Sequence, residues 1–305
     1  MKRIVITGAT GAIGMALIQK CIKEKVEVLV ICRKDSKRIN RIPKHPLVQM
    51  LECDLSELGT INLQIDNKYD VFYHFAWAAT IGEGRNDMST QIRNIEYTID
   101  AVGLAKRLGC HTFIGAGSQA EYGRFEGSLS DQTPVFPENG YGMAKLCAGQ
   151  MSRVECKKKG IRHIWTRILS VYGPYDGDMT MIQSVIRKLL TGEKPSLTAG
   201  EQKWDYLYSE DAAEAMYLLG DKGIDGSIYC IGSGHVKPLK EYVEQLRDCI
   251  DPSLSLGIGE VPYADKQVMY LCADISKLTQ DTGFVPQTDF KTGIKTTIEW
   301  VKKEG

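Results

Sequence analysis

Residues 2–20, KRIVITGATGAIGMALIQK, decide the fold. A short apolar run of strand type enters a glycine-rich turn, and the residues beyond the turn have helical spacing. Gly8 permits a tight turn, Gly11 lets the backbone approach a pyrophosphate, and Gly14 allows the helix to pack closely on the strand. The helix N-terminus adds free N–H groups that favour phosphates.

The strand–turn–helix context indicates a dinucleotide site, although a glycine turn of purely structural use is the alternative. The expected contacts of the turn come from Gly8, Thr10, Gly11, Ala12, Ile13 and Gly14. We expect further cofactor contacts from Leu55, shortly after the third predicted strand, and from Phe75 and Ala76, at the end of the fourth.

Apolar runs and helical patterns alternate along the first part of the chain. The runs are nearly continuous in apolar residues, which is typical of strands covered on both faces. They lie at 2–8, 26–33, 47–53, 69–76, 111–117, 162–168 and 226–232, with helices expected at about 89–108 and 141–159. The alternation predicts an α/β fold with a doubly wound parallel sheet of about seven strands.

The regular alternation fades after about residue 170. Helical patterns remain at 178–192, at 238–250 and near the C-terminus. We expect a dinucleotide-binding domain at 1–170, to which 205–235 returns, and a smaller substrate-binding domain at 171–305. The smaller domain should cover the carboxyl edge of the sheet, where open α/β sheets bind ligands.

The composition excludes several classes of protein. Among 305 residues, 38 Lys and Arg balance 38 Asp and Glu, which disfavours a nucleic-acid partner. The nine cysteines have no regular spacing and the five histidines stand apart, so no metal site is expected. No signal peptide and no apolar run of membrane-spanning length are evident, so a cytoplasmic protein without a membrane partner is expected.

The end of the second predicted strand bears on cofactor choice. Arg33 stands where proteins that bind NAD usually carry an acid that contacts the ribose. An arginine can hold the extra phosphate of NADP, and basic residues follow it, so NADP is expected and NAD is less favoured. A solvated basic loop is the alternative. Asp54, directly after the third strand, suits a contact to the adenine amino group or a helix cap.

Tyr141 and Lys145 lie four positions apart in PENGYGMAKL (137–146), on one face at the start of a helix. A nearby ammonium lowers the pKa of a tyrosine, which can then exchange a proton with a sugar or alcohol oxygen. The spacing alone is common in a chain with 14 tyrosines.

Several motifs in one order resemble the extended short-chain dehydrogenase/reductase family, particularly its nucleotide-sugar branch. They are GATGAIG (8–14), HFAW (74–77), Asn94, SQAEYG (118–123), the Tyr141/Lys145 pair, RILSVYGP (167–174) and WDYLYSED (204–211). The resemblance implies a Rossmann domain, a small substrate domain and a nucleotide-diphospho sugar as substrate. It also implies that Ser118 hydrogen-bonds the reacting sugar oxygen, Tyr141 is the acid/base, and Lys145 tunes Tyr141 and holds the nicotinamide ribose.

Two positions depart from the family pattern. Ser170 replaces a usual Asn, and Trp204 replaces an Arg that typically meets a nucleotide phosphate. The expected substrate-binding residues are Thr80, Ser118, Gln119, Ser170 and Trp204. For Trp204, packing at the domain boundary is the alternative.

The pair Gln119-Ala120 limits the reaction. Relatives that catalyse 4,6-dehydration carry Asp-Glu at these two places, and neither residue here can transfer a proton. Glu121 is expected to point away as a structural or rim group. The remaining reactions are NADPH-dependent reduction of a nucleotide-linked 4-keto-6-deoxy sugar, which Arg33 favours, and 4-epimerisation with bound NAD. A non-catalytic dinucleotide sensor or scaffold is the alternative of another class, but such proteins generally lose the Tyr or the Lys.

Two predicted helices carry apolar stripes, and relatives pair these helices across a two-fold axis as a four-helix bundle. The stripes are Ile92, Ile95, Ile99 and Val102, and Met143, Leu146, Met151 and Val154. We therefore expect a homodimer, with stripes that face only their own sheet as the alternative.

Overall fold

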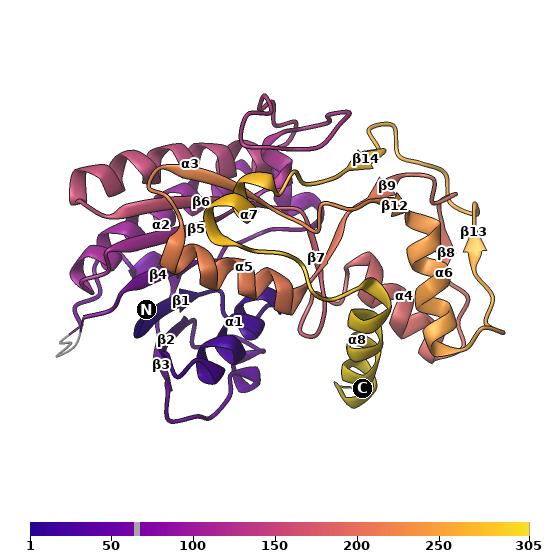
Figure 1. Cartoon of the computed structure of the whole chain (residues 1–305), viewed down its shortest axis with the longest axis horizontal. Coiled ribbons are helices and arrows are strands. Elements are labelled where there is room, and N and C mark those ends of the chain that lie inside the picture. Colours follow the sequence, from indigo (N-terminus) through magenta and orange to yellow (C-terminus); the bar gives the residue numbers. More distant parts are fainter. Residues whose placement is uncertain (64–67, 305) are drawn as a thin grey trace.

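The computed structural model describes residues 1–63 and 68–304, and a seven-stranded parallel sheet lies at its centre (Figure 1). In spatial order the strands are β11 (Ser227–Ile231), β6 (Arg162–Ile168), β5 (Thr112–Ser118), β4 (Val71–His74), β1 (Arg3–Thr7), β2 (Glu27–Cys32) and β3 (Val48–Glu52). All six pairings between neighbours are parallel. The strand order reverses direction between β1 and β4, as in the doubly wound dinucleotide-binding fold.

Helices cover both faces of this sheet. On one face α1 (Ala12–Lys23) packs beside α5 (Ser209–Lys222), and on the other α2 (Met88–Arg107) packs beside α3 (Gly140–Lys159) (Figure 1). Successive strand residues point to opposite faces, so Ile4 and Ile6 join the α1/α5 core while Val5 joins the α2/α3 core. Burial on both faces explains the continuous apolar runs.

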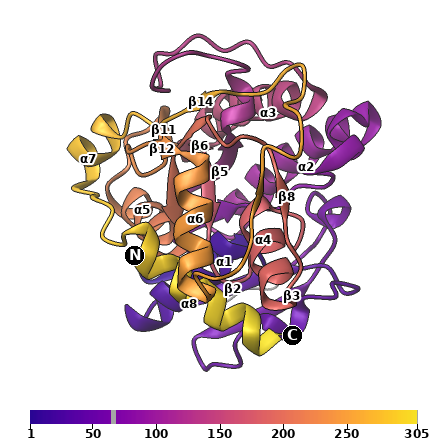
Figure 2. The same cartoon turned by 90° about the vertical axis from the view of Figure 1, so that its right-hand side faces the viewer.

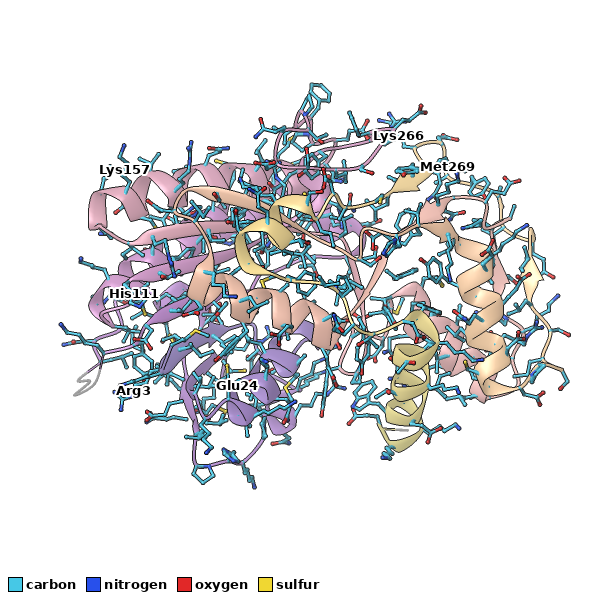
Figure 3. The ribbon with its side chains drawn as sticks, viewed as in Figure 1. Arg3, Glu24, His111, Lys157, Lys266 and Met269 are labelled. Atoms are coloured by element: carbon cyan, nitrogen blue, oxygen red, sulfur yellow. The ribbon has the colours of Figure 1, made fainter. Side chains whose placement is uncertain are left out.

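A second group of helices lies beyond the carboxyl ends of the strands (Figure 2). It consists of α4 (Met181–Leu190), α6 (Leu239–Ile250) and α8 (Phe290–Glu304), which share a core that includes Tyr242 and Ile294. Arg3 and His111, at the amino ends of β1 and β5, lie at the opposite end of the molecule from Met269 (Figure 3).

Within the described residues, short strands form three further small sheets. The strands pair as β7 (Ser170–Tyr172) with β10 (Tyr206–Tyr208), β9 (Lys203–Trp204) with β12 (Lys237–Pro238) and β14 (Tyr270–Leu271), and β8 (Ser196–Leu197) with β13 (Gly257–Ile258). The remaining helical turns are η1 (Ile39–Arg41), η2 (Leu55–Glu57), η3 (Gly82–Asn86), η4 (Gln119–Glu121) and α7 (Ser276–Thr282).

The predicted fold class and the seven-stranded parallel sheet are confirmed. The main difference concerns β4, which ends at His74, so the expected strand residues Phe75 and Ala76 lie in the loop that follows. In the part of the chain that the structure describes, no helix combines the length and apolarity needed to cross a bilayer.

Candidate active site

The glycine turn between β1 and α1 has the geometry that a pyrophosphate requires. Gly8 has a φ of +72°, and a Cβ there would lie 2.5 Å from the backbone nitrogen of Ala76. A Cβ on Gly14 would lie 2.6 Å from Cα of Ala9, so only glycine lets α1 approach so closely. At Gly11 a Cβ meets nothing within 4 Å, which leaves open space at the N-terminus of α1. The turn therefore fits a dinucleotide.

A cleft of about 890 Å³ extends from this turn along the carboxyl ends of the strands. Of the predicted cofactor residues, it is lined by Gly8, Thr10, Arg33, Asp54, Leu55, Phe75 and Ala76. Ala12, Ile13 and Gly14 belong instead to the first turn of α1.

The basic residues after β2 open onto the same cleft. Lys37 and Arg38 line it together with Arg33, whose side chain is 63% exposed. The Arg33 Nε lies 3.5 Å from a carboxylate oxygen of Asp35. An acid therefore partly offsets the charge on which the NADP prediction depends.

Asp54 has the helix-capping role that was one of the two alternatives predicted for it, and the contact to adenine stays a prediction. It lines the cleft, and its Oδ1 accepts hydrogen bonds from the backbone nitrogen (3.0 Å) and hydroxyl (2.8 Å) of Ser56. These bonds cap η2 and lower the pKa of the Asp54 carboxyl. One carboxylate oxygen is thus used for the cap.

The corner after β5 places Ser118 at the end of a buried strand. Its Oγ accepts a hydrogen bond from the backbone nitrogen of Ala120 at 3.2 Å, and this bond caps η4. Gln119 is half-buried at the start of η4, while Ala120 and Glu121 are buried.

Tyr141 and Lys145 lie in the first turns of α3, which Asn139 caps by accepting a bond from the Gly142 nitrogen at 2.8 Å. The Lys145 Nζ donates to the carbonyl oxygen of Ala116 at 2.6 Å and lies 5.7 Å from the centre of the Tyr141 ring. The structure thus brings Lys145 and Tyr141 to the carboxyl end of β5, beside Ser118.

Burial shifts the pKa of both residues. It lowers the pKa of Lys145 to about 7, against a partial opposing effect of Glu121. Burial also raises the pKa of Tyr141, while the Ser118 hydroxyl and the Arg85 guanidinium lower it. In the protein alone, desolvation of Tyr141 therefore exceeds the stabilisation of tyrosinate that we expected from the sequence.

The loop after β4 contributes contacts that we did not predict. The Lys145 Nζ lies 3.7 Å from the centre of the Trp77 ring. The Trp77 ring also contacts the Tyr141 ring edge-on, with the two ring centres 6.2 Å apart. Asn94 fixes this loop, because its amide bonds both the nitrogen and the carbonyl oxygen of Ala78 at 3.0 Å. No residue spacing indicates these contacts, although Trp77 and Asn94 both belong to the family motifs.

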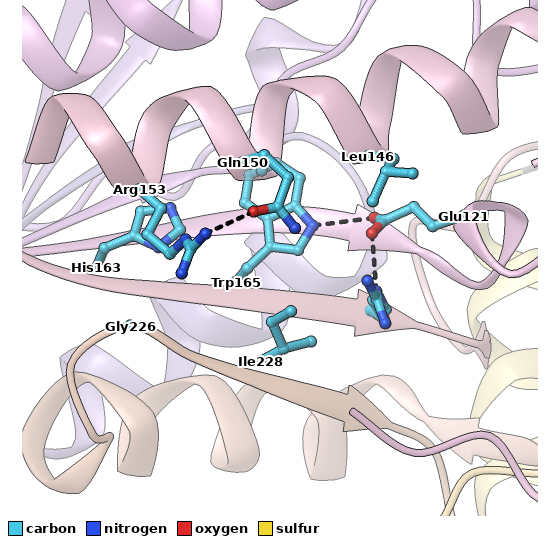
Figure 4. A pocket seen from close by; sticks show the side chains of 10 residues that line it. Glu121, Leu146, Gln150, Arg153, His163, Trp165, Gly226 and Ile228 are labelled. Carbon is cyan, nitrogen blue, oxygen red and sulfur yellow. Dashed lines mark hydrogen bonds and ion pairs between the residues drawn. The ribbon is translucent and has the colours of Figure 1, made fainter. Parts of the chain in front are cut away.

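Glu121 is a structural group and not a rim group. Its Oε1 accepts hydrogen bonds from the Ser118 backbone nitrogen and the Trp165 Nε1, both at 2.9 Å, and its Oε2 pairs with the Arg167 Nε at 2.8 Å (Figure 4). The carboxylate is buried and is directed toward Trp165 and Arg167 of β6. It therefore holds the corner that carries Ser118.

The two departures from the family pattern contact each other. The Trp204 Nε1 donates to the Ser170 Oγ at 2.7 Å. Trp204 also lines an apolar cavity of about 340 Å³ with Leu197, Val243 and Ile258. Thr80 is exposed, and its carbonyl oxygen lies 3.4 Å from the Arg85 Nη1. Trp204 packs against the core shared by α4, α6 and α8 and also faces a cavity, and its contact with substrate stays a prediction.

The doubly wound sheet and the glycine turn define the class of the molecule, an oxidoreductase-type enzyme of the extended short-chain dehydrogenase/reductase kind. The chain belongs to the NAD-dependent epimerase/dehydratase family, whose model matches residues 4–232.

Known proteins similar to this chain perform more than one reaction. It is 24% identical to dTDP-glucose 4,6-dehydratase of Escherichia coli, over 98% of this chain and 93% of that protein. UDP-glucuronic acid 4-epimerase from Bacillus cereus, in complex with UDP-glucuronic acid and NAD, has a TM-score of 0.86 at 21% identity, with 99% and 100% coverage. The dTDP-glucose 4,6-dehydratase DesIV from Streptomyces venezuelae, with NAD and TYD bound, has a TM-score of 0.85 at 21% identity, with 99% and 97% coverage. At these identities the similarity to solved structures shows the shared fold.

Proposed function

We propose that this protein is a 4-epimerase of a nucleotide-linked sugar that keeps NAD bound throughout its cycle. The corner after β5 is the observation that carries this proposal. It places Ser118 beside Tyr141 and Lys145, but Gln119 and Ala120 cannot transfer protons. Glu121, the nearest acid, is held in a buried ion pair. Chemistry at a single carbon is therefore favoured over dehydration.

The residues of the corner suit both directions of such a reaction. Tyr141 takes the proton of the sugar C4 hydroxyl as the carbonyl forms, and returns it when the alcohol is restored. Ser118 hydrogen-bonds the same oxygen and so stabilises the charge that develops on it. Bound NAD would supply the hydride chemistry, accepting the hydride from C4 and giving it back, and the glycine turn around Gly8 and Gly11 would hold its pyrophosphate. Between the two steps, the keto sugar must present its other face to the returning hydride.

The NAD part of the proposal is supported by the structural neighbours in complex with NAD and by Asp35, which faces Arg33. The second candidate is the NADPH-dependent 4-keto-6-deoxy sugar reductase. Arg33, Lys37 and Arg38 favour it, because all three line the cofactor cleft and a phosphate would be attracted to them.

The proposal assigns separate tasks to the two parts of the chain. Residues 1–170 with 205–235 bind the cofactor, and the rest of 171–305 binds the substrate. The apolar cavity beside Trp204 is the place we assign to the nucleotide end of the substrate, since the Trp204–Ser170 pair adjoins it. A homodimer through α2 and α3 is also proposed.

A substrate panel tests this function. Purified protein is incubated with UDP- and dTDP-linked sugars without added cofactor, and products are resolved by NMR, with Tyr141→Phe as control. We expect tightly bound NAD to be released on denaturation and two 4-epimers to interconvert without net use of cofactor. Oxidation of one NADPH per keto sugar would establish the reductase instead, and binding without any turnover would favour a sensor.

A further inference from the structure

A second basic side chain, besides Lys145, lies against the ring of Tyr141. The Arg85 guanidinium carbon is 4.4 Å from the centre of the Tyr141 ring. Arg85 belongs to η3, in the loop between β4 and α2. It has no role in the family motifs identified in the sequence.

Hydrogen bonds hold η3 against both neighbouring helices. The Gly140 nitrogen, at the start of α3, donates to the Asn86 Oδ1 at 3.0 Å. The Gln91 Nε2, from α2, donates to the carbonyl oxygens of Ala79 and Gly84 at 3.0 Å each. The backbone around Arg85 is therefore fixed relative to the helix that carries Tyr141, and the Arg85 Nη1 donates to the carbonyl oxygen of Thr80 at 3.4 Å.

Besides burial, Ser118, Arg85 and Glu121 shift the pKa of the Tyr141 phenol, and Lys145 lies 5.7 Å from the centre of its ring, so four elements contribute a group. Lys145 comes from α3 itself, Arg85 from η3, Ser118 from β5 and Glu121 from η4. Burial lowers the pKa of Lys145 to about 7, so this amine loses its proton well before a buried phenol ionises. An arginine guanidinium stays protonated over the same range. When tyrosinate forms in the protein without cofactor, Arg85 is thus the cation that remains beside it.

We propose that Arg85 is a positioning residue whose guanidinium stabilises the tyrosinate form of Tyr141. This inference rests on the acid/base role of Tyr141 in the proposed function. The cation shares the work that the family pattern gives to the lysine alone, and it keeps the tyrosine active at pH values where Lys145 is neutral.

Titration of Tyr141 tests the proposal without a substrate. The chemical shift of the Cζ carbon of isotope-labelled tyrosine is followed against pH, and Tyr141→Phe assigns the signal. The variants are Arg85→Gln and Arg85→Met, which remove the charge, and Arg85→Lys, which keeps it. Arg153→Gln removes a charge from the far part of α3 and serves as the matched control.

We expect Arg85→Gln and Arg85→Met to move the Tyr141 midpoint upward by at least about one pH unit, the low end for loss of a neighbouring opposite charge. At the wild-type midpoint, about a tenth of Tyr141 or less would then be ionised. Arg85→Lys keeps the charge and should therefore leave the Tyr141 midpoint close to its wild-type value. Arg153→Gln should leave the midpoint unchanged. A midpoint unchanged in both neutral variants, or moved equally by Arg85→Lys, would overturn the proposal and leave Arg85 a packing role. Because no turnover is measured, this outcome is independent of whether the enzyme is an epimerase.

Discussion

Two Arg–Glu pairs of this protein have almost the same length and very different surroundings. Arg167–Glu121 (2.8 Å) has side chains only 3% and 1% exposed, whereas Arg124–Glu138 (2.7 Å) is 46% and 28% exposed. Removing one partner of a buried pair leaves a buried charge without compensation. We therefore predict that Glu121→Gln lowers the free energy of unfolding by about 3–5 kcal/mol in urea titrations.

Glu138→Gln is the matched control and should change stability little, because water already solvates that pair. The double variant Glu121→Gln/Arg167→Met, which leaves no buried charge, should recover part of the loss. Equal stability of Glu121→Gln and Glu138→Gln would show that the buried pair does not hold the corner.

The lowered pKa of the buried Lys145 amine leads to a specific dependence of folding stability on pH. Burial lowers its pKa from 10.5 to about 7, so between these values the unfolded chain carries a proton that the folded chain lacks. The free energy of unfolding should therefore rise with pH across this window, by up to about 1.4 kcal/mol per pH unit. Below pH 7 the folded protein carries the full cost of burying the protonated amine. Urea unfolding of wild type and Lys145→Met between pH 7 and 10 measures it. The difference between the two proteins should change across the window, and a constant difference would contradict the buried, neutral amine.

At the scale of elements, the strands and helices could largely be predicted from the sequence, because parallel strands buried on both faces leave continuous apolar runs. The orientation of α3 about its axis could not be predicted from the sequence. The face of α3 that packs on the protein carries small residues, because there is no space for larger ones. A Cβ on Gly149 would lie 2.7 Å from the Trp165 ring, and a Cβ on Gly142 would lie 2.3 Å from the Ala120 carbonyl oxygen. The larger apolar residues Met143 and Met151 are exposed as a result.

The exposed apolar residues of α2 and α3 lead to a prediction about assembly. Val154 on α3 is 52% exposed, and Val285, in the loop between α7 and α8, is 54% exposed. We predict a homodimer by light scattering at micromolar concentration. Val154→Glu should shift it toward monomer by burying a charge in the interface, while the matched Val285→Glu should not. A monomeric wild type, or equal behaviour of the two variants, would contradict the four-helix bundle.

The part of the candidate site that is built from residues close together in the sequence could be predicted. Tyr141 and Lys145 share one helix face, so their spacing is visible in the sequence, as are the glycines of the turn. Trp77 and Arg85 reach Tyr141 from a loop, and such contacts follow from the path of the backbone and not from residue spacing. The direction of the Glu121 side chain behind the corner likewise depends on Arg167 and Trp165, two strand residues far along the chain.

At the scale of the whole molecule, the cleft at the carboxyl edge of the sheet decides cofactor choice. If the epimerase proposal is right, wild type should bind NADH at least as tightly as NADPH, because Asp35 offsets the charge of Arg33. Arg33→Asp should weaken NADPH binding by about 1.5–3 kcal/mol, the scale of hydrogen bonds to charged groups, and leave NADH binding nearly unchanged. Competition of NADH and of NADPH with the bound NAD measures both affinities. A strong wild-type preference for NADPH would move the assignment to the reductase.

The central claim, hydride removal and return at one sugar carbon, is tested most directly with substrate deuterated at C4. The account predicts that the deuterium is retained at C4 in both epimers, with no net use of cofactor and with turnover reduced about 10²–10⁴-fold in Tyr141→Phe, as expected for loss of a general acid and base. Deuterium at C6 of a 6-deoxy product would establish dehydration, and consumption of reduced cofactor with a keto sugar would establish reduction. Either result would contradict the account.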